Sequence, residues 1–99
     1  MSNVQADLDS LRQLYNTLKN DVELSHSIQT DTDSALSNTV WESANAEKFR
    51  AAWDEFKPKL IAFEQTFADA ASDVATNHNN LVIANGEDDE HLPPVTAIA

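Results

Sequence analysis

The sequence predicts an all-α protein, an antiparallel two-helix hairpin that dimerises into a four-helix bundle. Two long segments each carry an apolar residue at every third or fourth position, which is the spacing of one helix face. The chain has only one glycine and three prolines among its 99 residues, and only Pro58 falls inside a periodic segment. Two apolar stripes interrupted once are therefore expected to form two helices joined by a turn.

The composition narrows the possible functions. Six basic and seventeen acidic residues give a formal net charge of −11, so we expect no nucleic acid partner, because phosphate binding requires clusters of Lys and Arg. The chain has no cysteine, which excludes disulfides and cysteine-ligated metals. The first residues form neither a basic region nor an apolar run, and no stretch reaches the length of a membrane span. We expect no cleavable signal peptide and no membrane insertion.

The first helix is expected over residues 2–38. Its apolar stripe has heptad spacing, and a shorter second row lies beside it. Together they are wider than one neighbouring helix covers, so part of this face is expected to contact something outside the hairpin. The stripe consists of Val4, Leu8, Leu11, Tyr15, Leu18 and Val22, and the second row of Leu14, Leu24, Ile28 and Ala35.

The second helix is expected over residues 46–84, after a turn at 39–45. Its stripe steps by three and four without a slip, and we expect it to be the seam of the hairpin core and the dimer. Pro58 is expected on the solvated side of this helix, where a kink is tolerated, with a helix terminus as the alternative. Gly86 predicts a left-handed stop. The seam consists of Phe49, Trp53, Phe56, Leu60, Phe63, Phe67, Val74 and Leu81, with Ala46, Ala70 and Asn77 completing the spacing.

Residues 87–99 predict a flexible, acidic, proline-containing tail that follows the helical domain of residues 1–86. Four successive acids repel one another, and Pro93 and Pro94 impose an extended backbone, so we expect the tail to stay out of the core. Two roles stay open for it, a segment that docks in extended form on another protein and a disordered end.

No catalytic, cofactor or metal site is predicted. The histidines at 26, 78 and 91 lack metal-ligand spacing, and a single glycine cannot form a phosphate-binding loop. The acidic residues of the two helices, Glu64 among them, are expected on solvated faces. We therefore expect neither enzyme activity nor a cofactor.

The turn sequence Trp41, Glu42 and Ser43, followed by residues 44–53, resembles the Trp-X-Gly family of about a hundred residues, the early secretory antigenic target type of type VII secretion. The layout matches over residues 2–86. Ser43 stands where the family has glycine. Either Ser43 adopts a positive φ at a cost of about 1 kcal/mol, or it caps the second helix. The family's Tyr-x-x-x-Asp/Glu export motif after the second helix is absent, because the only tyrosine lies in the first helix.

The resemblance implies a small virulence-related effector, a substrate or co-exported partner of a type VII secretion system. Such a chain is cytoplasmic before export and secreted without a cleavable signal peptide. The implied partners are another helical-hairpin chain of the family and the secretion motor ATPase. Because both helices are acidic, a less acidic hairpin is favoured over a second copy, with a homodimer as the alternative. A non-exported cytosolic adaptor or chaperone for a larger toxin is the alternative function.

Trp41 has two expected roles. It closes the apolar end of the hairpin, or its exposed part is recognised by another protein, and the two roles are compatible.

Overall fold

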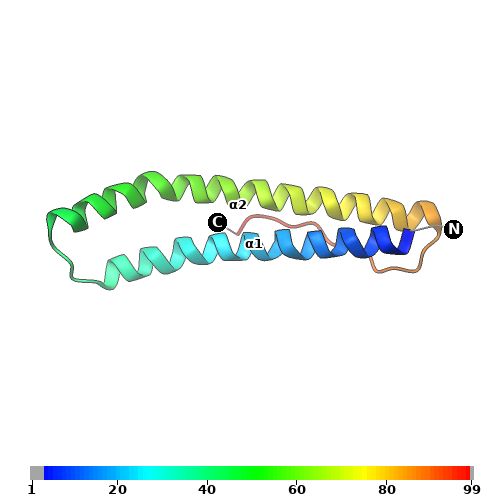
Figure 1. The fold of residues 1–99 in the computed structure, drawn as a ribbon, viewed down its shortest axis with the longest axis horizontal. Coiled ribbons are helices and arrows are strands. Elements are labelled where there is room, and N and C mark those ends of the chain that lie inside the picture. The colour runs from blue at the N-terminus through cyan, green and yellow to red at the C-terminus, as the bar shows by residue number, and fades with distance from the viewer. Residues whose placement is uncertain (1–3, 99) are drawn as a thin grey trace.

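The computed structural model describes residues 4–98, which form a long helical hairpin (Figure 1). Helix α1 spans Val4–Asn38 and helix α2 spans Ala44–Asn85, and the two run antiparallel in contact along their length. The molecule measures 65 × 20 × 18 Å. The predicted all-α hairpin is confirmed, and no strand occurs among residues 4–98. The expected helix start at residues 2 and 3 lies outside the described part of the chain.

Both ends of α2 are capped. Ser43 has an extended backbone with φ −171° and ψ 169°, and its hydroxyl accepts a hydrogen bond of 3.1 Å from the Ala46 N–H. Capping is thus the alternative that the structure adopts at Ser43, because an extended residue does not need glycine. At the other end Gly86 has φ 60° and its N–H donates to the Ile83 carbonyl at 3.3 Å. The predicted glycine stop is confirmed.

Pro58 lies inside α2 and is exposed. The helix continues on both sides of it, and Figure 1 shows α2 as one uninterrupted ribbon. The helix terminus considered for Pro58 is therefore not present. An exposed proline is tolerated here because water can bind the carbonyl that loses its helical partner.

The seam between the helices is the set of residues that both helices bury against each other. On α2 this seam is rich in alanine, which lets the backbone of α1 approach closely. Its apolar members are Leu8, Tyr15 and Val22 of α1 and Ala46, Trp53, Ala68, Ala71, Ala75 and Val82 of α2. Its polar members are Ser25, Gln29, Glu64 and His78.

The seam on α2 is rotated by about one residue from the predicted stripe. Phe49, Phe56 and Phe63 are 43%, 50% and 48% exposed, so their assignment to the core of the hairpin is wrong. The buried residues also step by three and four, so a second stripe beside the phenylalanines satisfies the same pattern. The alanine stripe faces α1 because small side chains pack two helices more closely than a row of rings does.

The tail, residues 87–98, turns back after Gly86 and runs between the two helices (Figure 1). Leu92 is 6% exposed and belongs to a core cluster with Tyr15, Ala71 and Ala75. The expectation that the tail stays out of the core is therefore wrong. Charge repulsion among its acids is offset by contacts with α1 and α2, and the small alanines leave room for the apolar side chain of Leu92.

Candidate functional site

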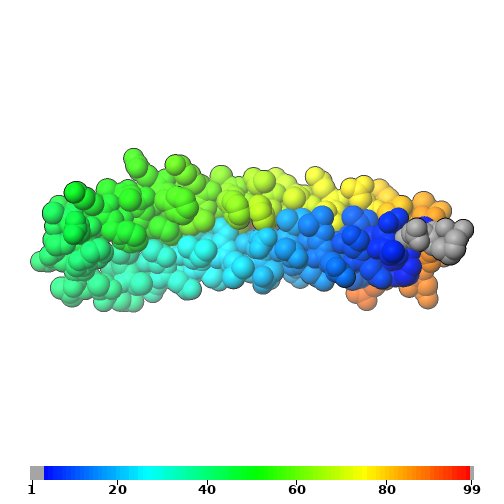
Figure 2. All heavy atoms as spheres, viewed as in Figure 1, coloured from blue at the N-terminus to red at the C-terminus, as the bar shows by residue number. Residues whose placement is uncertain are grey.

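The hairpin has two long faces, one on each side of the seam. Residues that directly follow seam positions of α2, such as Ser72 and Asn79, bind the tail. In an antiparallel pair, residues that follow the seam on both helices lie on one side, and residues that precede it lie on the other. Phe49, Phe56, Phe63 and Phe67 each come directly before a position of α2 that faces α1, so they lie on the side opposite the tail. Figure 2 shows tail atoms only near the start of the tail, while the two helices fill the rest of the view.

We call the first side the phenylalanine face. Its α2 part is a row of Phe49, Phe56, Phe63 and Phe67, in which the last two rings stack with centroids 4.2 Å apart. The α1 part contains Leu14, Leu24 and Ile28, the second apolar row of the sequence, and these side chains are 47%, 52% and 48% exposed. Large apolar side chains that gather on one exposed side of a protein are typical of a protein–protein contact surface.

A hollow of about 360 Å³ opens on this face near the elbow of the hairpin. Its apolar walls are Phe49, Ala52, Trp53 and Phe56, and Glu55 and Lys59 lie at its edge. The four wall residues are spaced i, i+3, i+4 and i+7 along α2. This is the set of four residues that forms the hole for a side-chain knob from a partner helix in knobs-into-holes packing.

Trp41 extends the phenylalanine face onto the elbow. Its ring lies 6.2 Å from that of Phe49, centroid to centroid, and it is 40% exposed. The Arg50 guanidinium donates to the Trp41 carbonyl at 2.9 Å, which fixes the linker against α2. Trp41 therefore packs on the hairpin with one side and faces solvent with the other.

We call the second side the tail groove. The tail lies in it with its backbone bound by helix side chains. Asn79 forms a pair of bonds with Leu92, accepting from its N–H at 2.8 Å and donating to its carbonyl at 2.9 Å. The Ser72 hydroxyl forms the equivalent pair with Val95, at 2.9 and 2.8 Å. The groove thus binds a peptide chiefly through backbone groups.

A charged cluster holds the start of the tail. Asp89 lies 3.0 Å from the ring of the buried His78 and 3.2 Å from the Arg12 guanidinium. The hydrogen bond from His78, followed by that from Arg12, holds the pKa of the Asp89 carboxyl below its usual value. The other ring nitrogen of His78 lies 3.1 Å from the Asn79 side-chain oxygen. Both ring nitrogens of His78 therefore contact side-chain oxygen atoms.

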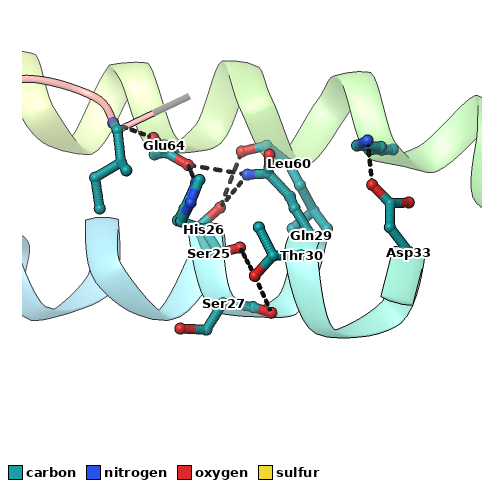
Figure 3. A network of polar contacts seen from close by, with 10 residues as sticks. Ser25, His26, Ser27, Gln29, Thr30, Asp33, Leu60 and Glu64 are labelled. Atoms are coloured by element: carbon teal, nitrogen blue, oxygen red, sulfur yellow. Dashed lines mark hydrogen bonds and ion pairs between the residues drawn. The ribbon is translucent and has the colours of Figure 1, made fainter. Parts of the chain in front are cut away.

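The end of the tail contacts a buried carboxylate. Figure 3 shows Glu64 reaching from α2 toward α1, where Gln29 donates to one of its oxygens at 3.0 Å. The Ile98 N–H donates to the other oxygen at 2.7 Å. Glu64 has no exposed surface, so its assignment to a solvated face is wrong. The free-energy cost of burying this carboxylate is offset by the hydrogen bonds that it accepts.

A second carboxylate links the helices near the elbow. Asp33 of α1 accepts a hydrogen bond of 2.8 Å from the Trp53 indole and another from the Lys57 ammonium. The contact with Lys57, and next that with Trp53, lowers the pKa of Asp33. The hydrogen bond from the Trp53 indole to Asp33 fixes the orientation of Trp53, which forms one wall of the hollow on the phenylalanine face.

The predicted site residues are divided among these regions. Leu8, Tyr15, Val22 and Trp53 lie in the seam, while Val4, Leu11, Leu18, Leu60, Phe67, Val74 and Leu81 are half-buried beside it. Trp41, Glu42 and Ser43 form the elbow and are exposed. Reasoning from the sequence missed the groove residues Ser72, His78 and Asn79, although their spacing along one side of α2 was a signal for them.

Neither described helix is long and apolar enough to cross a membrane. Within residues 4–98 no group of three or more histidine or acidic side chains is arranged to hold a metal ion.

No protein-family model, curated protein or solved structure matches this chain.

Proposed function

We propose that the chain is a helical pairing module, a substrate or co-exported partner of a type VII secretion system that acts by pairing with another helical hairpin. The observation that carries the proposal is the hollow bounded by Phe49, Ala52, Trp53 and Phe56 at the elbow end of an exposed apolar face. Such a hole is the receptor half of helix–helix packing, and its other half is a large apolar knob on a partner helix.

The dimensions of the face support a four-helix bundle. Exposed apolar side chains run from Phe49 to Phe63 on α2 and from Leu14 to Ile28 on α1. The two rows adjoin where Gln29 of α1 contacts Glu64 of α2, and there the face is two helices wide. Another two-helix hairpin laid on it would bury both rows at once, as in a four-helix bundle.

The charge of the chain supports a partner of a different sequence. A second copy would bring two chains of net charge −11 together. A less acidic hairpin would be attracted instead, which raises the association rate and the specificity. A heterodimer is therefore the form that we propose, and the homodimer is the competing outcome.

The connection with type VII secretion rests on the elbow. A tryptophan at the elbow between two antiparallel helices of similar length resembles the layout of the Trp-X-Gly family. The extended φ of Ser43 explains how this chain can form the elbow without the family's glycine. The half-exposed Trp41 ring is available to another protein at the end of the hairpin.

The test of pairing is native mass spectrometry of the chain alone and with a candidate hairpin encoded in an adjacent reading frame. We expect a one-to-one complex that is lost in Phe63→Asp. The matched control is Ile61→Asp, because Ile61 is similarly exposed but directly follows the half-buried Leu60 and so lies on the tail-groove side of α2. The proposal would be defeated if both variants lost the complex equally. It would also be defeated if the unchanged chain associated neither with itself nor with the candidate hairpin.

The test of export is recovery of the chain from culture medium, with and without a working secretion motor. A chain that pairs normally but stays inside the cell would favour the adaptor or chaperone function instead.

A further inference from the structure

The tail is bound in a repeating pattern along α2. The N–H groups of Leu92, Val95 and Ile98, three residues apart, donate to side chains of Asn79, Ser72 and Glu64 in turn. On α2 these acceptors are spaced by seven and eight residues. The tail therefore runs antiparallel to α2 and presents every third N–H to it.

This pattern matches two regular geometries. Three residues of a polyproline II chain advance about 9 Å, and seven residues of an α-helix advance about 10.5 Å. Pro93 and Pro94 favour the extended conformation because their rings fix φ. Two turns of α2 and one turn of the extended chain therefore cover similar distances. Each acceptor on α2 meets the N–H of every third tail residue, and the side chains at 92, 95 and 98 lie on one side of the tail.

Helix α1 binds the carbonyl groups of the same segment. The Tyr15 hydroxyl donates to the Pro93 carbonyl at 2.7 Å, and the Arg12 guanidinium donates to the Glu90 carbonyl at 2.8 Å. These two carbonyls are also three residues apart. Side chains of α1 therefore bind carbonyl groups of the extended backbone, and side chains of α2 bind both its N–H groups and its carbonyl groups.

We propose that the tail groove is a binding site for the tail of a second copy of this chain, an extended segment with an apolar residue at every third position. The side chains that the groove requires are apolar ones at the positions of Leu92 and Val95, which pack against the core cluster. The remaining recognition goes through the backbone, which a tail from another copy presents in the same way.

The chain's own tail competes with a tail from outside. Only residues 87 and 88 separate Gly86 from the charged contact at Asp89, so the tail is held at a high effective concentration beside its groove. An external tail binds when the chain's own tail is weakened or when the chain is concentrated.

The first experiment uses the full-length chain carrying Leu92→Asp and Val95→Asp, so that its own tail competes poorly. A fluorescent peptide of residues 87–98 is titrated against it and against the unchanged chain. We expect saturable binding to the variant, at least tenfold tighter than to the unchanged chain.

The matched controls are two doubly N-methylated peptides. Methylation at Val95 and Ile98 removes two N–H groups that α2 binds, and we expect at least a tenfold loss of affinity. Methylation at Thr96 and Ala97 adds two methyl groups at the positions between Val95 and Ile98, and we expect the affinity to change less than threefold. Equal affinity of the two peptides, or no binding to a variant that keeps its helix content by circular dichroism, would overturn the proposal.

A second measurement decides the matter if the double variant loses its helices. The chain has no cysteine, so Thr96→Cys places one nitroxide label on the exposed side of the tail. Labelled chain is mixed with ¹⁵N-labelled, otherwise unchanged chain at millimolar concentration. We expect relaxation enhancement at Val22 and Glu23, which line the hollow beside Thr96. Enhancement that is absent, or that does not rise with concentration, would overturn the proposal.

Discussion

The phenylalanine face and the tail groove are built from the same two helices, one on each side of the seam. The groove side carries polar side chains, Ser72 and Asn79 among them, and the chain's own tail covers it. The opposite side carries Phe49, Phe56 and Phe63, each 43–50% exposed, and within residues 4–98 no segment crosses it as the tail crosses the groove.

The difference follows from the chemistry of each side. Side-chain amide and hydroxyl groups bind a backbone through directional hydrogen bonds, so an extended segment of the same chain can satisfy them completely. A row of rings offers no such bonds and is stabilised only by removing apolar area from water. Within residues 4–98 the hairpin has no further apolar element to place there, so we infer that the phenylalanine face is covered by another molecule.

The strongest test of this contrast compares one ring from each side. Tyr15→Ala removes a ring from the core cluster that holds Leu92, and we expect the free energy of unfolding to fall by about 3–5 kcal/mol. Phe56→Ala removes a half-exposed ring, and we expect a fall of less than about 1 kcal/mol.

Urea unfolding followed by circular dichroism, at a concentration where the chain is monomeric, measures both values. Similar losses in the two variants would mean that the phenylalanine face already contributes to the stability of the single chain, and the contrast would fail.

The general outline of the hairpin could be predicted from the sequence, because the features that indicate it are patterns among residues close together in the chain. Heptad spacing, the scarcity of glycine and proline, and the stop at Gly86 are all properties of neighbouring residues. The rotation of α2 could not be predicted in this way. Two adjacent stripes, one of alanines and one of phenylalanines, both step by three and four, and only packing against α1 decides between them.

The tail was mispredicted for a similar reason. Four acids and two prolines indicate an unpacked segment when the tail is considered alone. Its contacts come from residues that lie far away in the sequence, since Arg12 reaches Asp89 and Tyr15 reaches Pro93. No local pattern carries that information. The burial of Glu64 was hidden likewise, because its donor Gln29 is on the other helix and its donor Ile98 is at the far end of the chain.

The next prediction concerns Glu64, which links the seam to the end of the tail. Glu64→Ala leaves the Gln29 and Ile98 donors without this acceptor, and we expect the free energy of unfolding to fall by about 1–3 kcal/mol. Glu64→Gln keeps one oxygen for one donor but presents an NH₂ group to the other, so the Ile98 amide should lose protection from hydrogen exchange. The control is Glu55→Ala, an exposed site on the same helix, with an expected change within about 0.5 kcal/mol. A Glu64→Ala chain as stable as the parent would show that the buried carboxylate is not needed.

A smaller effect on stability is expected at the elbow. Trp41→Ala removes the ring pair with Phe49, which is worth about 0.5–1.5 kcal/mol in general. If the phenylalanine face continues onto the elbow, the same change should weaken pairing with a partner hairpin at least tenfold. Val40→Ala is the control, because Val40 is 94% exposed in the same linker. Unfolding and titration experiments separate the two effects, and unchanged values in both would remove Trp41 from the face.

The smallest expected effect is a release of the tail in acid that leaves the helices in place. In the docked tail the pKa of Asp89 is lowered by His78 and Arg12, whereas in a released tail it returns to the usual value of about 3.9. A lowered pKa stabilises docking above that usual value, and this stabilisation is lost as the pH falls through the lowered one. Protection of the Leu92 amide from hydrogen exchange should therefore fall below about pH 4, while helix content is kept.

Glu64 is also a carboxylate, but it binds the far end of the tail at Ile98, so the Leu92 amide is the appropriate probe. In Asp89→Asn the same amide should be less protected at neutral pH and should lack the acid transition. An acid transition that persists unchanged in Asp89→Asn would assign it to another group, and the charged cluster would then not be what holds the start of the tail.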